Sequence, residues 1–228
     1  MRARTFCLLA ALVMPALAAA AGIADLSNRD AVAGLKEALV KGSQVAVQHL
    51  GAENGFFGNA KVKIPLPETL KKVEGLMRTF GMGKQADELV LRMNRAAEAA
   101  VPEAKALLLD AVKKMSVQDA KGILTGGNDA ATQYFKRTTS GTLEQRFLPI
   151  VKKAMDRVKL AEAYNHYAER GAKFGLLKAE DAKLENYITR KAMDGLFLVI
   201  AEEEARIRKD PVGEASDIIK KVFGALGK

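Results

Sequence analysis

Hydrophobic residues recur along most of the chain at spacings of three and four, the period of an amphipathic helix. Gly51 ends one such stripe, Pro102 kinks or divides another, Ser140-Gly141 breaks a third, and Pro149 is expected near a helix start or a bend. The pattern therefore predicts an all-α fold in a single domain. The expected helices cover about residues 27–50, 67–81, 84–115, 116–126, 128–140, 142–158, 159–170, 181–208 and 215–223.

The stretch from Asp181 to Arg208 organises this prediction. Its centre, residues 192–201, is apolar on every face of a helix except at Asp194 and Gly195. A helix that is hydrophobic all round is buried, and ten residues fall short of the roughly 20 that a membrane span needs. We therefore expect a buried C-terminal helix at the centre of the domain.

Residues 51–67 are the least helical part of the chain. Asn54-Gly55 and Gly58-Asn59 are turn dipeptides, and residues 61–66 alternate between polar and apolar side chains. Pro65 confines such a segment to an edge or to an extended arm. We expect one short extended or hairpin-like arm near residues 54–66.

The first 21 residues have the three parts of a cleavable secretory signal. Arg2 and Arg4 precede an apolar run, and small residues from Ala18 to Gly22 fit the cleavage pattern. An uncleaved membrane anchor is the alternative, but the apolar run is too short to span comfortably. We expect cleavage near residue 21, a mature helical domain over residues 22–228 without a transmembrane span, and a periplasmic location.

Composition narrows the classes of partner. The only cysteine, Cys7, lies inside the expected signal, so the mature chain has no disulfide. Without Arg2 and Arg4, 34 basic residues stand against 27 acidic ones, a net charge of +7 spread along the chain. This excess suits contact with an anionic envelope surface, or simply keeps the protein soluble. Nucleic acid is not an expected partner, because the chain has no tryptophan and no basic stripe interleaved with aromatic residues.

Several segments resemble domain-of-unknown-function family 4197, a group of exported proteobacterial proteins without assigned activity. The similarity covers essentially the whole mature chain. It implies a helical fold and an envelope location, and it brings no catalytic residue. The segments that carry it are Phe56–Gly58 with Val62–Pro67, Ile123–Gly127 with Ala130–Phe135, Phe147–Val151, and Asp194–Phe197 with Ile200–Glu204.

No residue pattern specifies a metal site or a catalytic reaction. His49 and His166 are the only histidines, and neither has a second histidine at metal-binding spacing. The chain has no His-Glu-x-x-His motif, no calcium-binding EF-hand loop and no Gly-x-Ser-x-Gly motif. We therefore expect no metal and no cofactor and favour a non-enzymatic role, although residues distant in sequence can converge in a fold.

Gly126-Gly127-Asn128 is the first candidate for ligand binding. Two glycines before a helix start can direct backbone N–H groups toward an anion, and Lys136 and Arg137 follow two turns later. The alternative is a plain helix–helix join, in which glycine ends one helix and Asn128 caps the next. Asp129 would repel an anion and favours the join.

Asp194 is the second candidate. A carboxylate at the centre of an apolar helix has to be paired or protonated. Arg190 and Lys191 are within reach along the same helix, and a partner from another helix is equally compatible with the sequence. The alternative is that Asp194 lines a ligand pocket.

Phe56 and Phe57, with Lys61 and Lys63, form the third candidate. In an exposed loop they would contact a membrane or a protein partner; folded back, both rings would cover the helices as a lid. The methionines of the mature chain either fill the core or line a cleft for an apolar ligand. They are Met77, Met82, Met93, Met115, Met155 and Met193.

The sequence thus favours a non-enzymatic, soluble envelope protein that binds an apolar small molecule, a membrane surface or a protein partner. A hydrolase or transferase with a site near Asp194 and Gly126-Gly127 is the alternative. A structural interaction protein is the third interpretation.

Overall fold

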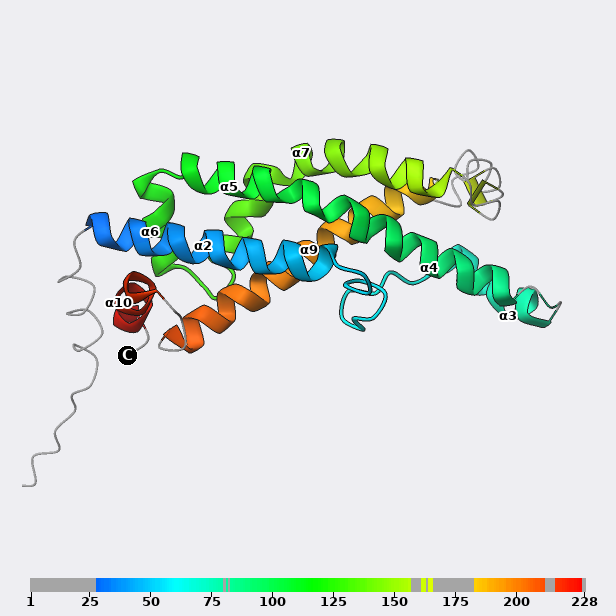
Figure 1. Cartoon of the computed structure of the whole chain (residues 1–228), viewed down its shortest axis with the longest axis horizontal. Helices are drawn as coiled ribbons and strands as arrows, with labels where there is room; N and C mark the ends of the chain where they lie inside the picture. Colours follow the sequence, from blue (N-terminus) through cyan, green and yellow to red (C-terminus); the bar gives the residue numbers. More distant parts are fainter. Residues whose placement is uncertain are drawn as a thin grey trace, which may run out of the picture.

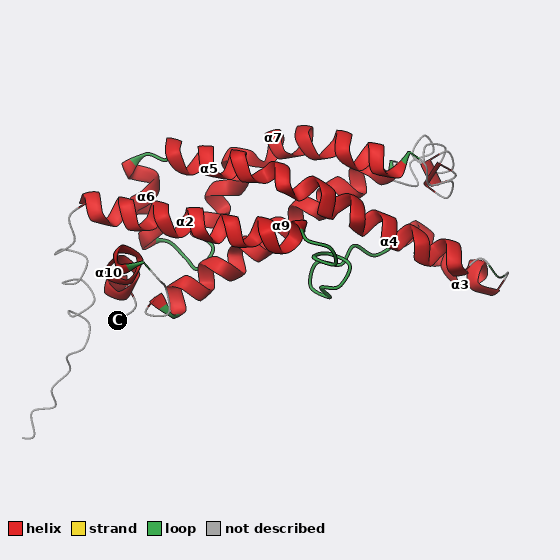
Figure 2. Ribbon diagram, in the orientation of Figure 1, coloured by secondary structure: helices red, strands yellow, loops and turns green. Residues whose placement is uncertain are grey.

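Helices and the loops between them make up the part of the chain that the structure, a computed structural model, describes (Figures 1 and 2). The described residues are 28–79, 81, 83–156, 161–162, 164–165, 183–211 and 216–226. None of them lies in a β-strand, and the expected all-α fold is confirmed. The helices are α2 (Asn28–Gly51), α3 (Glu68–Thr79), α4 (Gly83–Ala100), the 3₁₀ turn η1 (Val101–Glu103), α5 (Ala104–Lys114), α6 (Val117–Thr125), α7 (Ala130–Met155), α9 (Leu184–Lys209) and α10 (Asp217–Leu226).

The helix α9 is the centre of the bundle, as its apolar pattern predicts. It packs most extensively against α7, then against α2 and α4, and it crosses all three in Figure 1. Leu184, Ile188, Leu196 and Ile200 are among its buried side chains. Packing in this core, rather than helix propensity, holds the bundle together.

One face of α9 nevertheless reaches solvent, so the expectation of burial on every side is wrong. Asp194, Leu198 and Glu202 follow one another at intervals of four and form an exposed stripe. The side chain of Asp194 is 72% exposed, and Leu198 is 41% exposed. The surrounding helices cover only part of the circumference of α9, and Asp194 therefore needs no buried partner.

The helix α7 is continuous, which corrects the predicted break at Ser140-Gly141. Leu143, Phe147 and Val151 are buried at spacings of four and continue the buried face of the first half of the helix. Gly141 and Pro149 lie on its exposed side, where a missing side chain or a missing N–H group costs least. Tertiary packing therefore outweighs the local breaking signals.

Other boundaries follow the sequence. Gly51 ends α2, and Pro102 lies in the 3₁₀ turn that divides α4 from α5, as predicted. The predicted helix over residues 159–170 and the predicted start at Ser27 lie largely or wholly outside the described residues. No helix in the described part of the chain combines the length and the hydropathy needed to cross a bilayer.

Residues 52–67, here called the arm, connect α2 to α3 (Figure 1). The predicted alternation is confirmed: Val62, Ile64 and Leu66 are buried, whereas Lys61 and Lys63 are exposed. The arm is irregular and contains no hairpin, because its polar backbone groups bond to α4 and to its own turns. Asn54, with φ of 66°, supplies the left-handed residue of its first turn.

Candidate functional site

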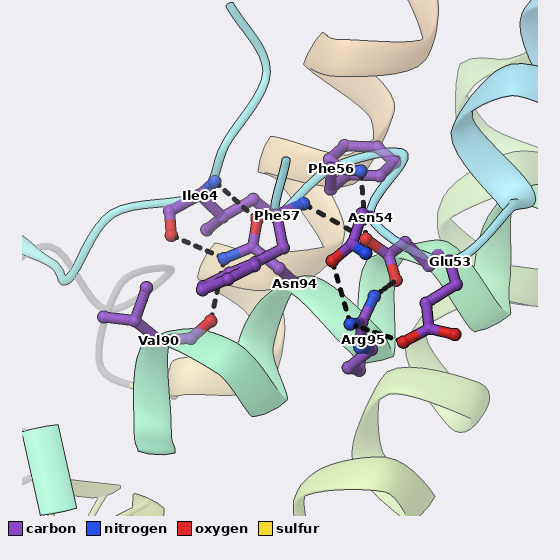
Figure 3. Close-up of polar contacts among 9 residues, drawn as sticks. Glu53, Asn54, Phe56, Phe57, Ile64, Val90, Asn94 and Arg95 are labelled. Carbon is purple, nitrogen blue, oxygen red and sulfur yellow. Dashed lines mark hydrogen bonds and ion pairs between the residues drawn. The ribbon is translucent and has the colours of Figure 1, made fainter. Parts of the chain in front are cut away.

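Two side chains on α4 attach the arm to the bundle (Figure 3). The buried carboxylate of Glu98 accepts hydrogen bonds from the backbone N–H groups of Phe56 (3.0 Å) and Phe57 (3.1 Å). Asn94, also buried, accepts from the N–H of Ile64 and donates to the carbonyl of the same residue. Arg95 pairs with Glu98 and offsets its charge, so the arm is a fixed part of the fold.

Phe56 is buried beneath the arm and is not available to a membrane. Its side chain has no exposed area, and it lies against Gly195 of α9, where an added Cβ would come within 2.7 Å of the phenyl ring. The lid interpretation thus describes Phe56. Phe57 is half-buried, with the ammonium group of Lys63 4.1 Å from its ring centre, and Lys61 pairs with Glu202 of α9.

A carboxylate from α9 already occupies the N-terminus of α7. Glu204 accepts from the backbone N–H groups of Ala131 and Thr132, each at 3.0 Å, and from the Thr132 hydroxyl group. Arg208 pairs with Glu204 and donates to the carbonyl of Ile123 near the end of α6. A buried ion pair therefore joins the positive end of one helix dipole to the negative end of another.

This arrangement changes the interpretation of the Gly126-Gly127-Asn128 turn. The N–H groups of Ala130 and Gln133 bond to backbone carbonyls, and those of Ala131 and Thr132 bond to Glu204. The first N–H groups of α7 thus have acceptors within the protein. Asn128 does not cap α7. The helix begins at Ala130, and the side chain of its N-cap residue, Asp129, makes no capping hydrogen bond. The turn is better described as a helix–helix join than as an anion site.

An open pocket of about 330 Å³ lies between α7 and α9. We call it the α7–α9 pocket, and its lining residues are Lys136, Ser140, Arg190, Lys191, Met193, Asp194 and Phe197. Its volume is at the lower end of the range found for small-molecule sites. Three side chains that line it are cationic and one is anionic, so its net charge is positive.

The contacts inside the pocket leave most of its polar groups facing solvent. The ammonium group of Lys136 lies 5.8 Å from the ring centre of Phe197, and that of Lys191 lies 3.8 Å from the carboxylate of Asp194. Such an exposed pair contributes little to stability, and both groups remain accessible to a ligand. Phe197 is largely buried and Met193 is half-buried, so these two residues provide the apolar lining.

The pocket unites some of the sequence candidates and separates others. Lys136 and Asp194, chosen for unrelated reasons, line the same pocket. Arg137 turns away, toward Asp119 and the ring of Tyr134. Glu204, which meets the start of α7, is ten residues beyond Asp194, or roughly 15 Å along α9. The structure does not bring Asp194 and the Gly126-Gly127 turn into one site.

Ser140, Arg190 and Lys191 complete the pocket, and the sequence did not identify them as site residues. The only signal was their spacing: Lys136 and Ser140 are four apart on one helix, as are Arg190 and Asp194 on another. The hydroxyl group of Ser140 donates to the backbone carbonyl of Lys136 at 2.7 Å, an acceptor that cannot act as a general base. This chemistry suits binding rather than nucleophilic catalysis.

The described core offers less to an apolar ligand or to a metal. A cavity among α2, α7, α9 and α10, lined by Leu39, Ser43 and Phe135 among others, measures about 20 Å³, close to the size of one water molecule. Met93, Met115 and Met155 are buried as core residues, and Met193 lines the α7–α9 pocket. Met82 lies outside the described residues. Within the described ranges, no three His, Cys, Asp or Glu residues come together to hold a metal ion.

Comparison with known proteins identifies a family. A family model described as a protein of unknown function (DUF4197) matches residues 25–224. No curated protein and no solved structure matches the chain. The matched range includes both helices of the α7–α9 pocket and the whole arm.

Proposed function

The chain belongs to the DUF4197 family of proteins of unknown function, and we propose that it is an exported, non-enzymatic binding protein of the cell envelope. Its ligand site is the α7–α9 pocket. The observation that carries this proposal is the convergence of Lys136, Arg190, Lys191 and Asp194, from two packed helices, on an open pocket large enough for a small molecule.

The pocket favours binding over the other interpretations of the sequence. Its charged side chains stand on α7 and α9, the two helices that pack most extensively together, so a ligand would meet a rigid framework. The hydroxyl group of Ser140 is directed to a backbone carbonyl, which gives a hydrolase or transferase no activated nucleophile there. The burial of Phe56 removes one of the two aromatic contacts that a membrane-binding arm would use.

Export is supported by the first 21 residues, in which Arg2 and Arg4 precede an apolar run and an Ala-x-Ala site. We propose that the protein acts in the periplasm after cleavage near residue 21. The net charge of +7 after cleavage favours negatively charged ligands over cationic ones.

Native mass spectrometry of the full chain, produced in a bacterial host and recovered from the periplasm, tests this function. We expect a mature mass that begins near residue 21 and a bound small molecule that is absent under denaturing conditions. A triple variant with Lys136→Gln, Arg190→Gln and Lys191→Gln should lose that molecule. A precursor that stays in the cytoplasm would contradict export, and a ligand-free monomer would contradict binding. A stable homo-oligomer without a ligand would instead favour a structural role.

A further inference from the structure

We propose that the α7–α9 pocket binds a phosphate monoester, an inference that rests on the binding function proposed above. Its first basis is charge. Lys136, Arg190 and Lys191 together carry three positive charges, and Asp194 carries one negative charge. The net charge of +2 matches a phosphate monoester, which carries nearly two negative charges at neutral pH.

The kinds of cation in the pocket are the second basis. Arg190, whose guanidinium group is planar, also has a contact within the protein, and Lys136 and Lys191 place compact charges on opposite helices. Arginine binds two phosphate oxygens at once, while lysine acts on phosphate as a point charge. Three cationic side chains thus suit the three oxygens and nearly two charges of a phosphate monoester better than a carboxylate, which has only two oxygens and one charge.

The apolar lining is the third basis. Phe197 is 4% exposed and Met193 is half-buried, and both border the same space as the cations. A phosphate group alone would leave these side chains and much of the 330 Å³ uncovered. An organic group joined to the phosphate fills that part of the pocket, which makes an ester a better fit than inorganic phosphate.

The carboxylate of Asp194 allows a prediction of the direction in which phosphate affinity changes. Its carboxylate lies 3.8 Å from the ammonium group of Lys191 and 72% of its side chain is exposed, so it opposes an anion without being required by the fold. Replacing it by asparagine removes one negative charge and releases Lys191. Phosphate binding should therefore become tighter in this variant.

Two sources could supply the same chemistry: a soluble phosphate monoester, or the headgroup of a lipid such as phosphatidic acid. Phenyl phosphate, measured by isothermal titration calorimetry, represents the first. Co-sedimentation with phosphatidylcholine vesicles that contain phosphatidic acid represents the second, with pure phosphatidylcholine vesicles as the blank. Binding in either assay supports the proposal and identifies the source.

The decisive comparison uses two triple variants of equal charge change in the mature chain. Lys136→Gln, Arg190→Gln and Lys191→Gln together should weaken binding by about tenfold or more, because three ion pairs are lost. The control replaces three exposed lysines outside the pocket, Lys105, Lys121 and Lys152, by glutamine and should bind as the wild type does. Asp194→Asn should bind a few times more tightly than wild type, and circular dichroism should show all variants folded.

Equal weakening in the two triple variants would overturn the proposal, because attraction would then depend on total charge alone. Absence of wild-type binding to both phenyl phosphate and phosphatidic acid vesicles would also overturn it. Such a negative result leaves the proposed function standing if the co-purifying molecule is still lost from the pocket variant. If that molecule is absent as well, both proposals fail together.

Discussion

Two buried glutamates carry out the same task at different levels of the bundle. Glu98 binds the backbone N–H groups of the arm, and Glu204 binds those at the start of α7. An arginine one turn away on the same helix, Arg95 or Arg208, pairs with each carboxylate. Buried charges persist only when they are paired and hydrogen-bonded, and both glutamates meet that condition.

Glu98→Ala should lower the free energy of unfolding by about 3 kcal/mol, because the N–H groups of Phe56 and Phe57 lose their acceptor. Urea denaturation measures this change. The control is Glu88→Ala on the same helix, whose exposed pair with Arg92 should contribute less than about 0.5 kcal/mol. Equal losses in the two variants would show that Glu98 does not hold the arm.

Glu204→Ala should cost more, about 3–5 kcal/mol, since it strands the mostly buried guanidinium group of Arg208 together with two N–H groups. Hydrogen exchange should also speed up at the amides of Ala131 and Thr132. The control is Glu202→Ala, two residues before Glu204 on the same helix. It removes only the exposed ion pair with Lys61 and should lower the free energy of unfolding by less than about 1 kcal/mol. Unchanged exchange at the start of α7 would contradict the capping role of Glu204.

At the scale of the element, the close contact between α9 and the arm depends on a glycine. A Cβ at Gly195 would lie 2.7 Å from a ring atom of Phe56 and 3.2 Å from the Cβ of Val62. Phe56 is completely buried and has no room to move aside. The glycine that interrupts the apolar centre of α9 is thus explained by the packing of a distant segment.

Gly195→Ala should therefore lower the free energy of unfolding, by about 1–2 kcal/mol, although alanine favours helices. Gly141→Ala provides the matched control in α7, because an added Cβ there meets nothing within 4 Å. That control should raise the free energy of unfolding by about 0.5–1 kcal/mol. Thermal denaturation gives both signs, and stabilisation by Gly195→Ala would show that the arm does not press on α9.

Local sequence patterns predicted where helices and extended segments lie better than they predicted where the helices end. The alternation of Val62, Ile64 and Leu66 correctly identified the buried side of the arm. The break predicted at Ser140-Gly141 was wrong, because the buried face of α7 continues through Leu143 and Phe147. A helix-breaking residue on an exposed face is tolerated when the opposite face is packed, and a sequence does not reveal which face that is.

For the whole molecule, Tyr187 links α9 to the arm and makes stability sensitive to alkaline pH. Its hydroxyl group donates to the carbonyl of Pro65 at 3.1 Å, and burial raises its pKa from 10.0 to about 12. The unfolded chain ionises this group first, so its contribution is present below pH 10 and is lost as the pH rises toward 12.

Tyr187→Phe should accordingly flatten the decline of the free energy of unfolding between pH 10 and 12, relative to wild type. Urea denaturation at pH 8, 10 and 11 provides the measurement. Other groups titrate in the same window, so the comparison is between the slopes of the two proteins. Parallel slopes would mean that Tyr187 ionises equally easily in the folded and unfolded chains.

The candidate site was only partly predictable for a physical reason. Lys136 and Asp194 were identified from sequence, but nothing local indicates that residues 58 positions apart line one pocket. Asp194 was expected to be buried, and its exposure depends on which face of α9 the neighbouring helices leave open. The Gly126-Gly127-Asn128 turn suggests an anion site because it precedes a helix. The acceptor for the N–H groups at the start of that helix, Glu204, lies more than 70 residues away in the sequence.

The most direct test of the account is a titration of the mature protein with phenyl phosphate, followed residue by residue in amide NMR spectra. We predict saturable shifts at Lys136, Ser140 and residues 190–197, which form the α7–α9 pocket, and no shift at residues 126–128. Shifts concentrated at residues 126–128, or spread over exposed lysines throughout the surface, would contradict it.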